Sequence, residues 1–299
     1  MRPSDLPELR DRQLGRFAEA TAGIAAASKK AEAGYLTVGP GPARIAKHLA
    51  GLRDIVCGPA WTETHWRMAD LFFVTSEMAT LAGSAAGSMP GFELHPDDLP
   101  SPSGVMYFDV SSLSLTFADN DPIEAFDLVV VWGPDHSGSA GNIALTFLTR
   151  NPREPVELMR IMEVALRWGD DPIAKVLQGH SEEAATWAGI VRCTWLLMQQ
   201  RVAAVDVARP DRASARRILR RGGSLDAVRV IRLRYAAGPP REPGESDRVY
   251  SHRWVVRGHW RKQWYASQGR HVPIWISPFV KGPDGAPLLG GEKVYAWTR

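Results

Sequence analysis

The residues from 252 to 262, His-Arg-Trp-Val-Val-Arg-Gly-His-Trp-Arg-Lys, carry the densest run of chemically useful side chains in the sequence. If this segment is extended, successive side chains point to opposite faces. The cationic face then carries Arg253, Arg257, His259 and Arg261. The other face carries mainly aromatic and apolar side chains, Trp254, Val256 and Trp260, together with Lys262. Because guanidinium groups bind phosphate in a forked geometry and stack on bases, the pattern predicts a surface for RNA or another anionic polymer.

A second basic cluster lies earlier in the sequence, in a helix expected over 212–221 that Gly222 and Gly223 would end. Its arginines are Arg216, Arg217, Arg220 and Arg221. Since Ile218 and Leu219 give only a narrow apolar stripe, most of this helix must face water or negative charge. We expect it to extend the predicted nucleic-acid surface.

The charge of the sequence is divided unevenly between its two parts. Residues 201–299 hold 20 Lys or Arg against 8 Asp or Glu, a net charge of +12, whereas residues 1–200 hold 16 against 25, a net charge of −9. Such asymmetry indicates either an anionic partner or a basic part that docks on the acidic part. Arginines serve both purposes equally well, so both interpretations stay open.

The same residues allow two alternative functions. In a metal-independent ribonuclease, His259 and His271 would transfer protons while Arg257 stabilises the charge that develops on the phosphate. In a protein- or peptide-binding assembly module, the tryptophans Trp254, Trp260 and Trp264 would contact a partner. We favour a non-catalytic protein, because the sequence contains no phosphate-binding loop, zincin motif or nucleophile elbow. In the loop 133–138, three consecutive residues, Asp-His-Ser, cannot converge as a catalytic triad.

Composition limits the class of protein further. The sequence has 299 residues, of which 44% are hydrophobic, which is enough to form a sizeable core. The eight histidines and two cysteines do not follow metal-ligand spacing, so we expect no metal and no cofactor. Apolar runs are far shorter than the roughly 18 residues of a membrane span, and the first residues do not resemble a secretion signal. The expected setting is cytoplasmic, with no membrane partner.

The elements that must position these residues indicate an α+β protein with a helical N-terminal part, a central antiparallel meander and a basic C-terminal antiparallel sheet. The expected regions are 1–95 (helical), 96–205 (β-meander plus helices) and 206–299 (basic helix and antiparallel β-sheet domain). Further helices are predicted over 14–24, 42–52, 62–81, 155–168 and 181–204. Strands are predicted over 105–117, 126–132, 142–149, 227–235, 271–276 and 293–297, and a long strand or a hairpin over 249–264.

The last two thirds of the sequence resemble a family of uncharacterised proteins found in actinobacteria and their phages and mobile elements. The resemblance rests above all on the module His252-Arg253-Trp254-Val255-Val256-Arg257-Gly258-His259-Trp260-Arg261. It also rests on Leu99-Pro100-Ser101-Pro102-Ser103-Gly104, Val228-Arg229-Val230, Ile274-Trp275-Ile276 and Lys281-Gly282-Pro283. The arrangement is distantly similar to a type V anti-CRISPR family as well. The resemblance implies a phage-associated, cytoplasmic setting and no catalytic residue.

Together these observations predict a regulatory or anti-defence protein of the phage or mobile-element type. It would bind RNA or a ribonucleoprotein target without catalysis. The residues expected to bind nucleic acid are Arg216, Arg217, Arg220, Arg221, Arg253, Arg257, His259, Arg261 and Lys262.

Overall fold

The computed structural model describes residues 1–32, 60–110, 115–116, 122–123, 128–136, 142–150, 158–169, 182–234, 251–283 and 285–288. At its centre is a seven-stranded sheet with the strand order β7-β6-β5-β2-β1-β9-β8. The strands are β1 (Asp70–Val74), β2 (Gly104–Phe108), β5 (Leu128–Pro134), β6 (Ile143–Arg150), β7 (Leu158–Leu166), β8 (Ala203–Ala208) and β9 (Val228–Leu233). A separate short ribbon pairs β3 (Leu115–Thr116) with β4 (Pro122–Ile123). The predicted α+β class is confirmed.

The central sheet combines two kinds of strand pairing. The strands β2, β5, β6 and β7 pair antiparallel in chain order, which is the predicted meander. The strand β1, in contrast, runs parallel to both β2 and β9. The inner strands of this sheet are covered on both faces and therefore consist of continuous apolar runs. An example is the run Leu128–Trp132 of β5.

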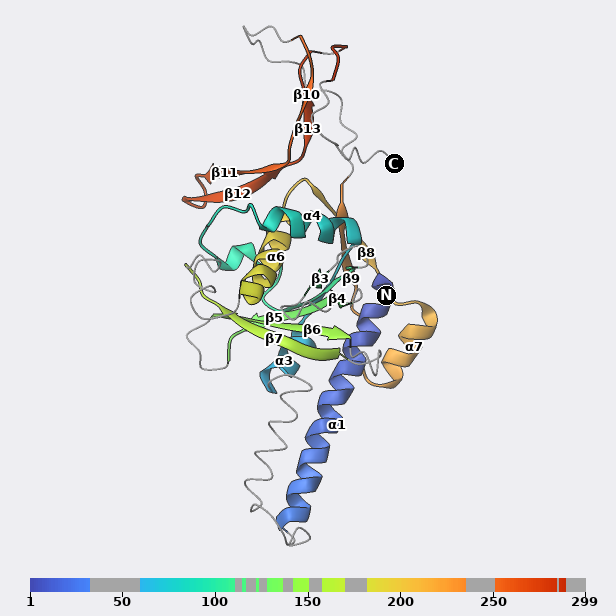
Figure 1. Cartoon of the computed structure of the whole chain (residues 1–299). Coiled ribbons are helices and arrows are strands. Elements are labelled where there is room, and N and C mark those ends of the chain that lie inside the picture. Colours follow the sequence, from blue (N-terminus) through green and yellow to red (C-terminus); the bar gives the residue numbers. More distant parts are fainter. Residues whose placement is uncertain are drawn as a thin grey trace.

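Helices cover both faces of the sheet (Figure 1). On one face, α4 (Ser76–Ala86) and α6 (Glu182–Met198) pack around Trp132, whose ring lies 5.3 Å from that of Trp195. On the other face lie α1 (Leu6–Glu32) and α3 (Ala60–Met68). The helix α7 (Arg212–Arg220) packs beside α1. The short 3-10 helices η1 (Pro3–Asp5) and η2 (Pro96–Asp98) complete the set of helices among these residues.

Two of the predicted helices are wrong because their segments contain strands of this sheet. The segment 62–81 contains the end of α3, the strand β1 and the start of α4. A fully buried parallel strand has no alternation, so periodicity cannot distinguish it from a helix. In the segment 155–168, the described residues 158–166 form β7, because pairing with β6 overrides their helical pattern.

Other boundaries also move. The predicted helix 181–204 ends at Met198 and is followed by β8, while the predicted strand 105–117 ends as β2 at Phe108. The predicted helix 42–52 and the predicted strand 293–297 lie outside the described residues. The central sheet takes strands from all three of the regions expected from the sequence.

The C-terminal part forms two antiparallel ribbons, and the described part of the segment 249–264, predicted as a long strand or a hairpin, is divided between them. One ribbon pairs β10 (Trp254–Val256) with β13 (Phe279–Lys281), and the other pairs β11 (His259–Tyr265) with β12 (Arg270–Ile276). The first ribbon extends away from the central sheet, and the second lies beside α4 and α6 (Figure 1). The chain changes ribbon at Gly258, which has room for no side chain because the ring of Trp275 occupies that space.

Candidate nucleic-acid interface

The ribbon β11–β12 is attached to the rest of the protein through its tryptophan face. The indole Nε1 of Trp260 donates a hydrogen bond of 2.9 Å to the carbonyl oxygen of Ala85, at the end of α4. Its ring meets that of Trp275 edge-on at 5.3 Å. Next to α6, the side chain of Gln200 accepts from the backbone N–H of Trp275 at 2.7 Å and donates to the carbonyl of Pro273 at 3.1 Å. These contacts turn the face of the ribbon that carries Trp260 toward α4 and α6, so the opposite face points outward.

A buried ion pair provides a second attachment. The guanidinium of Arg270, on β12, donates to both carboxylate oxygens of Asp98 at 3.1 and 2.7 Å. These side chains are only 15% and 5% exposed. Because the pair is shielded from water, the charge of Arg270 is neutralised inside the protein and is not offered to a ligand.

The outward face of the ribbon carries an exposed histidine and an exposed arginine. Alternation along β11 places His259 and Arg261 opposite to Trp260, and both are exposed. The guanidinium of Arg261 donates to the side-chain oxygen of Gln263 at 3.0 Å, and within the described ranges no carboxylate lies in ion-pair distance of it. Arg261 therefore keeps its charge at the surface.

Arg257 lies at the bend between the two ribbons. Its side chain is exposed, and its carbonyl oxygen is 3.0 Å from Nδ1 of His259. No ion pair of Arg257 occurs within the part of the chain that the structure describes. We name Arg257 and Arg261 the ribbon cations; the imidazole of His259 lies between them in the sequence.

Two further predicted site residues have other surroundings. Arg253 is half-buried, and its Nε donates to the carbonyl of Ala286 at 2.8 Å, so it holds β10 to the segment after β13. Lys262 is exposed but shares the inward face of β11 with Trp260 and Trp264. Because Gly258 interrupts the strand, the alternation predicted across the whole module holds only within β11.

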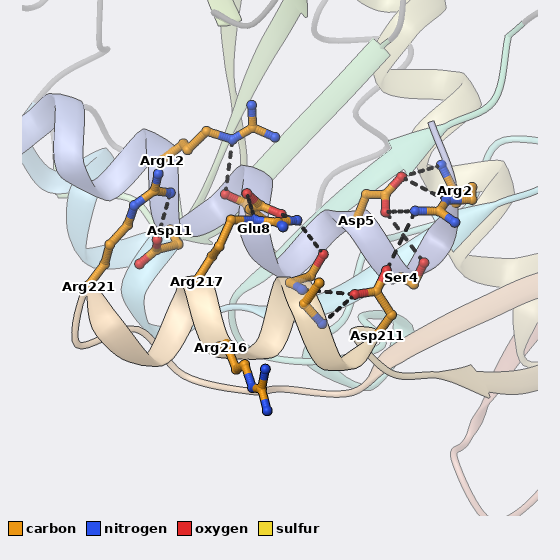
Figure 2. Close-up of polar contacts among 12 residues, drawn as sticks. Arg2, Ser4, Asp5, Glu8, Asp11, Arg12, Asp211, Arg216, Arg217 and Arg221 are labelled. Atoms are coloured by element: carbon orange, nitrogen blue, oxygen red, sulfur yellow. Dashed lines mark hydrogen bonds and ion pairs between the residues drawn. The ribbon is translucent and has the colours of Figure 1, made fainter.

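The arginines of α7 lie in a different environment from the ribbon cations. Arg217 donates to both carboxylate oxygens of Glu8 at 3.0 and 2.9 Å, and Arg221 lies 3.4 Å from a carboxylate oxygen of Asp11 (Figure 2). The hydrogen bond from Arg217 lowers the pKa of Glu8 below its usual value. The basic helix therefore docks on acidic residues of α1, which is one of the two interpretations that the charge asymmetry left open.

Arg216 and Arg220 remain outside this docking contact. Both are exposed, and Figure 2 shows Arg216 pointing away from α1. Nevertheless, α7 contacts α1 on one face of the central sheet, whereas β12 contacts α6 on the other (Figure 1). The two basic segments therefore do not join into one surface.

The register of the ribbon separates the two histidines of the ribonuclease hypothesis. His259 pairs with Ile276, whereas His271 pairs with Trp264. The two pairs are five positions apart along the ribbon, which is an odd number and corresponds to about 17 Å along the strands. The two imidazoles thus lie on opposite faces and are too far apart to act on one phosphate.

The aromatic surface of the assembly-module hypothesis is divided as well. Trp260 packs against α4 and the hydrophobic core, so it is not free for a partner. Trp264 is 51% exposed.

Of the described residues, no group of three or more His, Cys, Asp or Glu is arranged to hold a metal ion. No helix in the described ranges has the length and apolar character needed to cross a membrane.

Beneath the inward face of the ribbon lies a hollow that sequence reasoning did not find. Its volume is about 490 Å³. It is lined by Gly91, Phe92, Glu93, His95, Lys262, Trp264, Gly269, Arg270, His271 and Pro273. Because residues 91–95 and the ribbon are about 170 positions apart in the sequence, no local spacing could have revealed their contact.

Comparison with known proteins gives one similar structure to report. The crystal structure of AcrVA2, a type V anti-CRISPR protein, is similar over 90% of this chain and 97% of that chain, with 16% sequence identity and a TM-score of 0.43. No protein-family model matches the sequence, and no curated protein matches it. The likeness assigns no site residue, and the resemblance to actinobacterial and phage proteins stays a prediction.

Proposed function

We propose that the protein binds single-stranded RNA, alone or within a ribonucleoprotein, through the ribbon cations Arg257 and Arg261 and the neighbouring side chain of His259. The observation that carries this proposal is the contrast in charge pairing. Arg217, Arg221 and Arg270 each meet a carboxylate, whereas the described part of the chain places none beside Arg257 or Arg261. Exposed arginines without an internal partner are suited to a phosphate backbone.

The outer face of the ribbon also suits unstacked bases. Alternation along β11 places Tyr265, which is 38% exposed, on the same face as Arg261. On β12, Ile274 is the register partner of Arg261 and Ile276 that of His259; both isoleucines are half-buried and give that face an apolar floor. Aromatic and apolar side chains interleaved with cations are typical of surfaces that bind single strands, and RNA loops and ends expose such bases.

We further propose that binding leaves the RNA intact, because the separated histidines provide no acid-base pair on the outer face. The anti-defence setting belongs to this proposal on the basis of the sequence resemblance to phage-associated proteins. The partner would then be a transcript or a ribonucleoprotein of the opposing cell.

A salt titration with matched variants tests the proposal. The full chain is mixed with a labelled single-stranded RNA, and the dissociation constant is measured over a range of salt concentrations. For the double variant Arg257→Ala/Arg261→Ala we expect affinity to fall by about tenfold or more, because two charge-assisted contacts are lost. The slope of log K against log salt should decrease by about 1.4, since each phosphate contact on a single strand contributes about 0.7.

The control variant is Arg216→Ala/Arg220→Ala, which removes the same charge from exposed positions on α7. We expect it to change affinity by less than about threefold, since only long-range attraction is reduced. If both double variants lost the same affinity for RNA, the effect would come from net charge alone, and the proposed site would be contradicted. No binding of wild type at low salt would overturn the function itself.

A further inference from the structure

The hollow beneath the ribbon has the size and lining of a small-ligand site. Its volume of about 490 Å³ lies within the range of roughly 300–1,000 Å³ that is usual for such sites. One wall is the inward face of β11–β12 and the other is the segment 91–95. The ion pair between Arg270 and Asp98 fixes these walls together, so the space is held open by buried contacts.

An exposed aromatic pair forms one side of the hollow. Trp264 is 51% exposed, and its ring lies 5.0 Å from that of His271, its register partner on β12. A tryptophan that exposes half of its surface within a hollow offers a flat apolar plane to a ligand. A planar ring could therefore stack on it, as nucleobases do on aromatic side chains.

The charged groups of the hollow are of both signs. Lys262 is exposed and has no ion pair within the described ranges. The carboxylate of Glu93 lies 3.7 Å from Nε2 of His95. The charge of Arg270 is taken up by Asp98. Lys262 can thus bind a phosphate, whereas Glu93 can accept hydrogen bonds from the amino groups of a ring.

From this arrangement we propose that the hollow binds one nucleotide unit of the RNA. The base stacks on Trp264, its phosphate contacts Lys262, and Glu93 accepts from the edge of the base. This inference rests on the proposed function and adds a second subsite to it. The mixed charge favours a nucleotide over an acidic peptide, because Glu93 would repel the carboxylates of such a peptide.

The path of the strand follows from the order of residues on β11. Arg261 and Lys262 are consecutive, so they point to opposite faces of the ribbon. In the described part of the chain, β11 pairs only with β12, so no described strand occupies its other edge. A single strand held by the ribbon cations can therefore pass over this edge and place one nucleotide in the hollow.

The test uses the full chain with adenosine monophosphate as the probe and ribose 5-phosphate as the matched probe that lacks a base. Binding is measured by calorimetry. We expect adenosine monophosphate to bind wild type, Trp264→Ala to weaken that binding by about tenfold, and Trp264→Phe to retain most of it. Lys262→Ala should weaken both probes, whereas Arg216→Ala, at an exposed position on α7, should leave the affinity for adenosine monophosphate unchanged.

The two proposals fail in different ways. Equal affinity for the two probes, or no effect of Trp264→Ala, would overturn the nucleotide site even if RNA binding depends on Arg257 and Arg261. No binding of adenosine monophosphate at about 10 mM, far above the affinities usual for such ligands, would do the same. Conversely, if adenosine monophosphate binds through Trp264 but RNA does not bind at low salt, the hollow stands and the proposed function fails.

Discussion

The arginines of α7 and the arginines near β11 look equivalent in the sequence and have opposite surroundings in the structure. Arg217 and Arg221 meet Glu8 and Asp11 on α1, so their charge holds two helices together (Figure 2). Arg261 meets only a neutral side chain, Gln263, among its described neighbours. The difference teaches that a basic cluster shows its role only when the charges packed against it are known.

The reason lies in the spacing of charges on the two helices. Glu8 and Asp11 are three positions apart on α1, and Arg217 and Arg221 are four positions apart on α7, so each pair lies on one face of its helix. The acidic face of α1 and the basic face of α7 can therefore pack together so that each arginine meets a carboxylate. The ribbon β11–β12 is attached instead through tryptophans and one buried ion pair, which leaves its other face uncompensated.

The largest expected effect concerns that buried pair. Replacing Asp98 by Ala leaves the guanidinium of Arg270 buried without its carboxylate, which should lower the free energy of unfolding by about 3–5 kcal/mol. Urea denaturation measures this loss. The double variant Asp98→Leu/Arg270→Met should recover part of the stability, because it removes both charges. A loss below about 1 kcal/mol for Asp98→Ala would show that the ribbon is held mainly by its tryptophans.

A smaller loss is expected when Gly258 is replaced by Ala. The new methyl group would overlap the ring of Trp275 and force the bend between the two ribbons to shift, at a cost of about 1–3 kcal/mol. Thermal unfolding gives the change. The control is Gly15→Ala on α1, where no atom lies within 4 Å of the added group and stability should not fall. Equal behaviour of the two variants would contradict the close packing described for the bend.

The double variant Arg217→Ala/Arg221→Ala tests the contrast directly. It should lower the free energy of unfolding, because it removes the arginine partners of the Glu8 and Asp11 carboxylates, which are mostly shielded from water. In contrast, Arg257→Ala/Arg261→Ala should leave stability within about 0.5 kcal/mol of wild type. Chemical denaturation of both variants measures the two changes. A larger loss of stability in Arg257→Ala/Arg261→Ala than in Arg217→Ala/Arg221→Ala would contradict the contrast between the two basic clusters.

The smallest effect is a pH dependence at Glu8. Its pKa is lower in the folded protein than in the unfolded chain, chiefly through the hydrogen bond from Arg217. The unfolded state therefore binds the proton more readily, so this part of the stability is present above the ordinary glutamate pKa and is lost as pH falls through the lowered one. Unfolding measured between about pH 6 and 3 should show a shallower decline for Glu8→Gln than for wild type.

Much of the fold could be predicted from local patterns. The helices α1 and α7, the meander strands β2, β5 and β6 and the C-terminal strands β11 and β12 follow from periodicity, turn residues and capping. The strands β1 and β7 could not be found in this way. β1 is buried on both faces and lacks alternation, and β7 takes its conformation from its partner β6.

The candidate site divides in the same manner. The sequence itself determined where the cations lie and that alternation places Arg261 and Trp260 on opposite faces, because both are local properties of an extended chain. Only the tertiary structure decided which of these charges remain available. Arg217 meets a carboxylate 209 positions away, and Arg270 meets one 172 positions away. Coulombic pairing depends on distance in space, and the fold alone sets that distance.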